Sequence, residues 1–247
     1  MSPTITIVTV CLNAEATVER AVISVLKQTY PNVEYIIIDG ESTDGTLDIL
    51  NRYRDRVTLV SEPDKGIFDA MNKALKLAHG DWLLVLGADD YLLTENTLED
   101  AAKHFIEPDT VYYGDITSGV EGDRRHGKVS RYTALIKTIP HQAVFYPRSA
   151  YLSLEYDTRY PVVADRVYNF VLLARGVPFH YLDQVISFYS TGGYSFRVVD
   201  ETYKKDEFRI AMTLGPIPFL IFLGRYCYVK LHHYLHLCKV RIHGHDQ

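Results

Sequence analysis

The sequence contains little cysteine. Its 247 residues include Cys11, Cys227 and Cys238, and no CxxC pair occurs among them. An odd number of cysteines without paired spacing indicates neither a disulfide framework nor a zinc site, and it favours a reduced, cytosolic setting. A chain of this length buries about 70% of its unfolded surface without such cross-links. One large α/β domain, with or without a tail, is therefore expected.

A secretory signal and a long apolar run are also missing. The first residues lead straight into the apolar segment 5–10, without a basic stretch or a cleavage site. The longest late uncharged run, 210–224, has fifteen residues and is interrupted by Pro216 and Pro218. It is shorter than the roughly 20 residues that a membrane-spanning helix needs. We expect a cytoplasmic protein.

Acidic residues are absent between positions 208 and 245, a segment that contains five lysines and arginines. The rest of the chain is correspondingly acidic, which argues against nucleic acid as a partner. An aromatic, basic helix suits the surface of an anionic membrane, although it could equally pack on its own domain or on a second subunit of a dimer. We expect a domain over 1–205 and a helical tail over 206–247, peripheral at the inner face of the cell membrane.

Two common nucleotide-binding fingerprints are missing. No GxGxxG motif follows the first predicted strand, so an ordinary dinucleotide site is not expected. Residues 122–128 begin like a phosphate-binding loop, but Val129 stands where the serine or threonine belongs, and no apolar strand precedes them. That match is attributed to chance.

The first half of the chain alternates strand and helix patterns. Short apolar segments predict strands at 5–10, 35–39, 57–61, 82–86 and 110–113. Amphipathic spacing predicts helices between them, beginning near Val18, Thr46, Ile67 and Thr97. Such alternation predicts a largely parallel sheet with helices on both faces. After about residue 115 the regularity ends: 114–128 reads as a loop, 141–147 as a short strand and 161–175 as containing a helix.

Carboxylates follow two of the predicted strands. Asp39 ends the second, and Asp89 and Asp90 follow the fourth. In open α/β sheets ligands bind at the carboxyl ends of the strands, and Mg²⁺ or Mn²⁺ binds through one or two carboxylates plus substrate phosphates. A pair of aspartates after a strand is also typical of a solvated turn. We expect the three acids to face one cleft.

Five segments in the first 90 residues carry a family resemblance. They are IVTVCLN at 7–13, SVLKQTY at 24–30, IDGESTDGT at 38–46, EPDKGIFDAMNK at 62–73 and GADD at 87–90. In this order they resemble family 2 of the inverting glycosyltransferases, which has the GT-A fold, a Rossmann-like mixed sheet that binds nucleotide-diphospho-sugars. Residues 140–145 and 192–195 resemble members that act in exopolysaccharide, capsule or O-antigen assembly.

The resemblance implies transfer of a sugar from a nucleotide diphospho-sugar, UDP-linked by expectation, to a hydroxyl of a glycan or lipid-linked oligosaccharide. Asp39 would accept a hydrogen bond from the nucleobase, with Thr9 nearby. Asp64 and Lys65 would line the nucleotide side of the cleft, and Asp89 would contact the ribose or diphosphate.

The resemblance also implies a metal site. Asp90 would be the main ligand of Mn²⁺ or Mg²⁺, together with Asp89. Two departures bear on these roles. Glu41 replaces a glycine of the signature and could crowd the nucleotide pocket, and Gly87 stands where many members have a further acid.

An inverting transfer is one in-line displacement, so the acceptor hydroxyl must lose a proton as it attacks, and a positioned carboxylate can take it. The resemblance places this base at Asp165, with Asp157 as the second choice. An acid at the start of a helix is also favoured by the helix dipole alone.

His141 and Gln142 would contact substrate, and Asp115 would face the donor sugar. A packed core histidine and a simple turn aspartate are the plain alternatives for His141 and Asp115. Two other functions stay open at this point: a nucleotidyltransferase on a similar sheet, and a non-catalytic glycan-binding protein.

Overall fold

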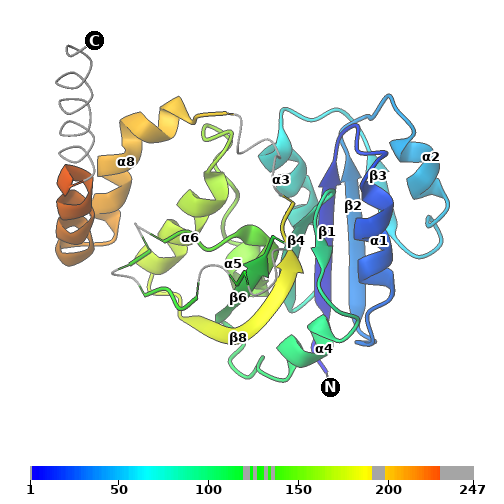
Figure 1. The fold of residues 1–247 in the computed structure, drawn as a ribbon, viewed down its shortest axis with the longest axis horizontal. Helices are drawn as coiled ribbons and strands as arrows, with labels where there is room; N and C mark the ends of the chain where they lie inside the picture. Colours follow the sequence, from blue (N-terminus) through cyan, green and yellow to red (C-terminus); the bar gives the residue numbers. More distant parts are fainter. Residues whose placement is uncertain are drawn as a thin grey trace, which may run out of the picture.

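The computed structural model describes residues 2–118, 123–124, 127–130, 133–134, 137–190 and 198–228. Within them an eight-stranded mixed sheet lies between two layers of helices (Figure 1). The strands are β1 Ile5–Cys11, β2 Val33–Asp39, β3 Thr58–Ser61, β4 Trp82–Gly87, β5 Tyr91–Leu92, β6 Val111–Thr117, β7 Val144–Pro147 and β8 Phe179–Phe188. The helices are α1 Val18–Leu26, α2 Thr46–Asn51, α3 Ile67–Leu77, α4 Thr97–Ala102, α5 Arg148–Tyr151, α6 Ala164–Ala174, α8 Glu201–Thr213 and the 3₁₀ turn η1 His141–Ala143.

The sheet has the strand order β3-β2-β1-β4-β7-β6-β8-β5. The first four strands of that order are parallel, and β7 reverses the direction by pairing antiparallel with both β4 and β6. In register, Cys11 lies opposite Asp39, and Asp39 lies opposite Ser61. The carboxyl ends of the parallel strands therefore meet at one edge, where ligands bind in open sheets of this kind.

Two apolar cores lie on the two faces of the sheet. On β1, Ile5 and Ile7 point to the core covered by α1, α2 and α4, whereas Val8 and Val10 point to the core covered by α3, α5, α6 and α8. This split follows from the two-residue alternation of side chains along a strand. Because both faces are covered, β1 is buried along its whole length.

The predicted strands and helices of the first half are confirmed to within a few residues at each end. Three expectations for the second half need correction. The strand predicted to end at Tyr113 continues to Thr117, inside the segment read as a loop. The predicted strand 141–147 begins as the turn η1, and the long strand β8 was not predicted at all.

The boundary predicted at residue 205 falls inside α8. Tyr203, Ile210, Ala211 and Leu214 all belong to the core on the α6 face of the sheet. The chain is helical again over 216–228, and Phe222 reaches the same core. The first part of the tail is therefore integral to the domain, and the predicted tail beyond residue 228 lies outside the described residues, as does 192–195. No helix in the described ranges is long and apolar enough to cross a membrane.

Candidate functional site

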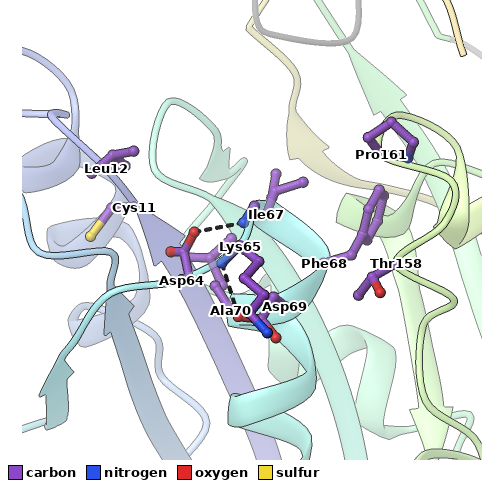
Figure 2. A pocket seen from close by; sticks show the side chains of 12 residues that line it. Cys11, Leu12, Asp64, Lys65, Ile67, Phe68, Asp69, Ala70, Thr158 and Pro161 are labelled. Atoms are coloured by element: carbon purple, nitrogen blue, oxygen red, sulfur yellow. Dashed lines mark hydrogen bonds between the residues drawn. The ribbon is translucent and has the colours of Figure 1, made fainter.

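Two hollows open at the carboxyl edge of β1 and β4. The first has a volume of about 420 Å³ and is bordered by Asp64, Lys65 and the start of α3, with Thr158 and Pro161 facing them from the opposite side (Figure 2). The second, about 330 Å³, is bordered by Asp89, Asp90, His141 and Gln142. Both hollows share the wall formed by Val10, Cys11, Leu12, Ile67, Phe68 and Pro161. They form one cleft, and six of the predicted site residues border it.

The loop before α3 shapes the first hollow. The backbone N–H of Gly66 donates to Asp64 Oδ1 at 2.9 Å, and that of Lys65 donates to Asp69 Oδ2 at 3.0 Å (Figure 2). Gly66 has φ +125°, a conformation that residues with a side chain rarely adopt. These contacts fix Asp64 at the rim while the Lys65 side chain stays exposed.

The turn after β4 shapes the second hollow. Asp90 is only 2% exposed. Its Oδ2 accepts from Gln142 Nε2 at 2.9 Å, and its Oδ1 accepts from the Ser190 backbone N–H, also at 2.9 Å. Burial, and then the charge of Asp89, raise the pKa of Asp90 to about 6. Two like-charged carboxylates in a confined space destabilise each other, which favours a cation between them.

Gly87 leaves the space in which these carboxylates meet. A Cβ at this position would lie 2.7 Å from Asp90 Oδ2 and 3.0 Å from Asp89 Oδ1. Both oxygens therefore converge on the backbone of Gly87, and a side chain there would displace them. Gly87 stands where many family members have a further acid, and the lack of space for a side chain explains the glycine at this position.

The residues present fit a divalent ion that is completed by substrate oxygens. Within the described ranges, no group of three or more histidine, cysteine, aspartate or glutamate side chains is arranged to hold a metal by itself. Asp89 and Asp90 offer two converging carboxylates, and Mg²⁺ in phosphate-transfer sites commonly takes one or two protein carboxylates plus phosphates.

Arg20 supports this turn and was missed by the sequence analysis. Its guanidinium donates to the Asp89 carbonyl at 2.9 Å and lies 4.4 Å from the centre of the Tyr91 ring, which stacks on Phe188. The contact joins α1 to a turn 69 residues away. No local pattern around Arg20 indicates such a partner.

His141 and Asp165 form a pair next to the second hollow. His141 Nδ1 lies 3.0 Å from Asp165 Oδ2, and their side chains are 15% and 13% exposed. Burial alone would lower the pKa of His141, but the hydrogen bond and charge of Asp165, with the charges of Asp90 and Asp89, raise it above its ordinary value. Of the two residues, His141 borders the hollow, whereas Asp165 lies behind it at the start of α6.

Asp39 and Thr9 border neither hollow. Asp39 is 0% exposed and accepts hydrogen bonds from the Ser42 and Ser61 side chains and the Ser42 backbone N–H. Its charge, after burial, raises the pKa of the neighbouring Cys11 thiol. Thr9 is equally buried and lies 3.0 Å from the Tyr35 hydroxyl. A contact of Asp39 with a nucleobase stays a prediction.

The polar groups of the loop after Asp39 form hydrogen bonds with the β1–α1 turn. Asn13 N–H donates to Ser42 Oγ at 2.8 Å, and Thr43 N–H donates to Asn13 Oδ1 at 2.9 Å. Ala14 N–H donates to Thr46 Oγ1 at 2.7 Å. Glu41, the other departure, is exposed and has φ +65°, a conformation that suits the glycine it replaces. Much of this signature therefore serves as scaffold.

Asp115 and Asp157 also lie outside both hollows. Asp115 is 1% exposed and accepts from Tyr181, Gly127 and Arg124, so it anchors the segment around residues 123–130. Asp157 is bound by Arg159, which lowers the pKa of that carboxyl. A lowered pKa makes Asp157 a weak proton acceptor.

Known proteins resemble the chain over most of its length. A PGL/p-HBAD biosynthesis glycosyltransferase of Mycobacterium bovis (strain BCG) is 35% identical over 215 residues, which covers 83% of this chain and 84% of the relative. Staphylococcus aureus TarS 1–349 superposes with a TM-score of 0.72 at 19% identity, over 90% of this chain and 71% of TarS. The same fragment in complex with UDP-GlcNAc gives a TM-score of 0.68 at 22% identity, over 85% of this chain and 66% of that one.

A third similar protein is the mannosyltransferase PcManGT of Pyrobaculum calidifontis, solved with GDP-Man and Mn²⁺. It has a TM-score of 0.65 at 21% identity, over 92% of this chain and 70% of that one. These structures share the GT-A fold expected from the sequence. The model described as Glycosyl transferase family 2 matches residues 6–177, more than half of the chain. The chain belongs to glycosyl transferase family 2.

Proposed function

We propose that this glycosyltransferase moves a sugar from a UDP-linked donor, with inversion, to a hydroxyl of a glycan or lipid-linked oligosaccharide in surface polysaccharide assembly. The single observation that carries the proposal is the continuous cleft, which has Asp64 and Lys65 in one hollow and Asp89 and Asp90 in the other. The biosynthetic relative, the TarS complex with UDP-GlcNAc and the PcManGT complex with GDP-Man support a nucleotide-sugar donor.

The proposal includes Mn²⁺ or Mg²⁺ held by Asp90 and Asp89. The convergence of both carboxylates on Gly87 supports it, as does the Mn²⁺ bound to PcManGT. When bound, such an ion neutralises charge that develops on the departing nucleoside diphosphate. Gln142 and the Ser190 N–H hold Asp90 in place for this role.

The remaining residues bind and orient. Asp64 and Lys65 lie where they can contact the nucleotide, and the apolar side chains of Leu12, Ile67 and Phe68 line both hollows. Proton removal from the acceptor is assigned to the Asp165 side of the second hollow, where the carboxylate is buried against His141. Holding both reactants here converts a bimolecular step into an effectively unimolecular one.

Product analysis tests the function against its two rivals. The protein is incubated with Mn²⁺, UDP-GlcNAc or UDP-glucose, and a panel of octyl glycosides as acceptors. Transfer releases UDP. A parallel incubation contains UTP, a sugar 1-phosphate and Mn²⁺, from which a nucleotidyltransferase would release pyrophosphate. A glycan-binding protein releases neither. We expect UDP, and release of pyrophosphate or of no nucleotide product from any donor would contradict the proposal.

We further propose that the C-terminal helices bind an anionic membrane surface from the cytoplasmic side. Met212, Ile217 and Leu220 are each more than half exposed on two consecutive helices. Lys204, Lys205 and Arg225 are exposed on the same segment. Exposed apolar side chains can insert into the membrane interface, and basic side chains are attracted to anionic headgroups.

Vesicle flotation tests this membrane contact. The full chain should float with vesicles of phosphatidylglycerol and phosphatidylcholine and should stay behind with phosphatidylcholine alone. Leu220→Glu should lower the floated fraction several-fold. Ile106→Glu is the matched control, because Ile106 is equally apolar and 78% exposed but lies elsewhere. Equal loss in both variants, or flotation independent of lipid charge, would contradict the assignment.

A further inference from the structure

The base at the second hollow consists of two residues. We propose that His141 contacts the acceptor hydroxyl and takes its proton, and that Asp165 is a positioning residue that acts through His141. This inference rests on the proposed transfer and assigns the proton step within it. It changes the role of Asp165 from proton acceptor to the group that orients the imidazole and stabilises its protonated form.

The hydrogen bond between the two residues fixes the tautomer of His141. A carboxylate can only accept hydrogen bonds, so the Asp165 oxygen 3.0 Å from Nδ1 requires the proton to be on Nδ1. The lone pair of the neutral ring is then on Nε2. Among the described residues no hydrogen-bond partner is found for Nε2, and the ring keeps 15% of its surface exposed.

The position of the pair relative to the cleft separates the two roles. His141 borders the second hollow together with Asp89 and Asp90, and Asp165 does not border either hollow. A substrate hydroxyl in the hollow therefore meets the imidazole first. Geometry is the first requirement for a general base, because it must reach the proton that it takes.

The backbone around His141 holds the ring in this place. His141 and Gln142 begin the turn η1, and the Gln142 side chain binds Asp90 at 2.9 Å while its carbonyl accepts from Ser187 Oγ at 2.7 Å. One dipeptide thus joins Asp90 on one side to Asp165 on the other. The His141 side chain contacts Asp165, and the neighbouring Gln142 side chain contacts Asp90.

The proton and electron balance of the step is simple. The acceptor O–H bond breaks and its proton goes to His141 Nε2, while the acceptor oxygen forms a bond to the anomeric carbon. The bond from that carbon to the diphosphate oxygen breaks, and its electron pair leaves with UDP. Asp165 stays a carboxylate and stabilises the imidazolium that forms, as the aspartate of a serine-protease triad does.

The charges around His141 set the expected pH dependence. The facing groups are Asp165 from α6 and Asp90 and Asp89 from the turn after β4, and together they raise the pKa of His141. A general base works in its deprotonated form, so the rate should rise with pH as the imidazole loses its proton. Removing Asp165 removes the largest of these raising charges and should move the rise to lower pH.

The key variant is His141→Asn, which keeps an amide N–H near the position of Nδ1 and can still donate to Asp165. It lacks Nε2. UDP release from UDP-GlcNAc in the presence of acceptor should fall about 10²–10⁴-fold, while the Kd for UDP stays within about twofold. The exposed His104→Asn is the matched control and should keep wild-type turnover.

Two further measurements exclude a merely structural role. His141→Ala should regain part of its turnover when free imidazole is added. Asp165→Ala should keep residual turnover, with the rising limb of its pH profile displaced to lower pH. If His141→Asn retains more than about a tenth of wild-type turnover while Asp165→Ala is inactive at every pH, Asp165 is the base and the inference is wrong. If the wild type releases no UDP, the proposed function itself has failed.

Discussion

Replacing Asp90 with alanine is expected to abolish Mn²⁺-dependent binding of UDP. Asp90 is the more buried of two carboxylates that converge on Gly87, and its oxygens are held in place by Gln142 and Ser190. Loss of its charge leaves Asp89 as the one carboxylate at this turn. Isothermal titration with UDP and Mn²⁺ should show affinity lower by more than about 100-fold, since even residues behind metal ligands alter affinity 10–100-fold.

The matched control is Asp55→Ala, which removes an exposed carboxylate that borders neither hollow. It should bind UDP and Mn²⁺ like the wild type. The same site predicts a pH signature. Burial and Asp89 raise the pKa of Asp90 to about 6, and a metal binds the ionised form, so affinity should fall as the pH drops below about 6. Wild-type affinity in Asp90→Ala would show that the ion is held elsewhere.

Replacing Asp165 with asparagine is expected to leave donor binding intact and to slow transfer strongly. The substitution keeps the size of the side chain but removes the charge beside His141. Because the charge matters when the acceptor proton moves, kcat should fall about 10²–10⁴-fold with little change in the Kd for UDP. Steady-state UDP release and equilibrium binding, measured on the same preparation, separate the two effects.

Asp157→Asn provides the control for this prediction. Asp157 was the second choice from the sequence, but Arg159 binds it and it borders neither hollow. Its asparagine variant should keep near-normal turnover. Near-normal turnover in Asp165→Asn, or its loss in Asp157→Asn instead, would show that the proton step does not depend on Asp165.

The residues predicted at the strand ends divide into two groups in the structure. Asp89 and Asp90 border the cleft because they follow β4, and the carboxyl end of a central parallel strand faces the ligand edge. Asp39 ends β2 and lies at the same edge, yet Ser42 and Ser61 donate hydrogen bonds to its carboxylate within the fold. A strand-end pattern predicts where an acid lies. It does not predict whether a neighbouring loop occupies that acid.

The other site contacts could not be predicted because they join segments that are distant in the sequence. Arg20 reaches the Asp89 carbonyl from α1, and Asp115 is bound by Tyr181 from β8, a strand that the sequence pattern did not reveal. β8 has exposed polar residues such as Asp183 within it, so neither its alternation nor its hydropathy is regular. His141 and Gln142 were placed in the cleft through family resemblance. Only the three-dimensional structure shows that His141 contacts Asp165 and that Gln142 contacts Asp90.

The most direct test of the central claim is the thermal stability of the wild-type protein with UDP, measured with and without Mn²⁺. A ligand that binds only the folded state raises the apparent melting temperature by mass action. We predict a clear stabilisation by UDP and Mn²⁺ together that neither gives alone. Equal stabilisation by UDP after the metal is removed with a chelator would contradict a site in which Asp89 and Asp90 hold an ion against the donor diphosphate.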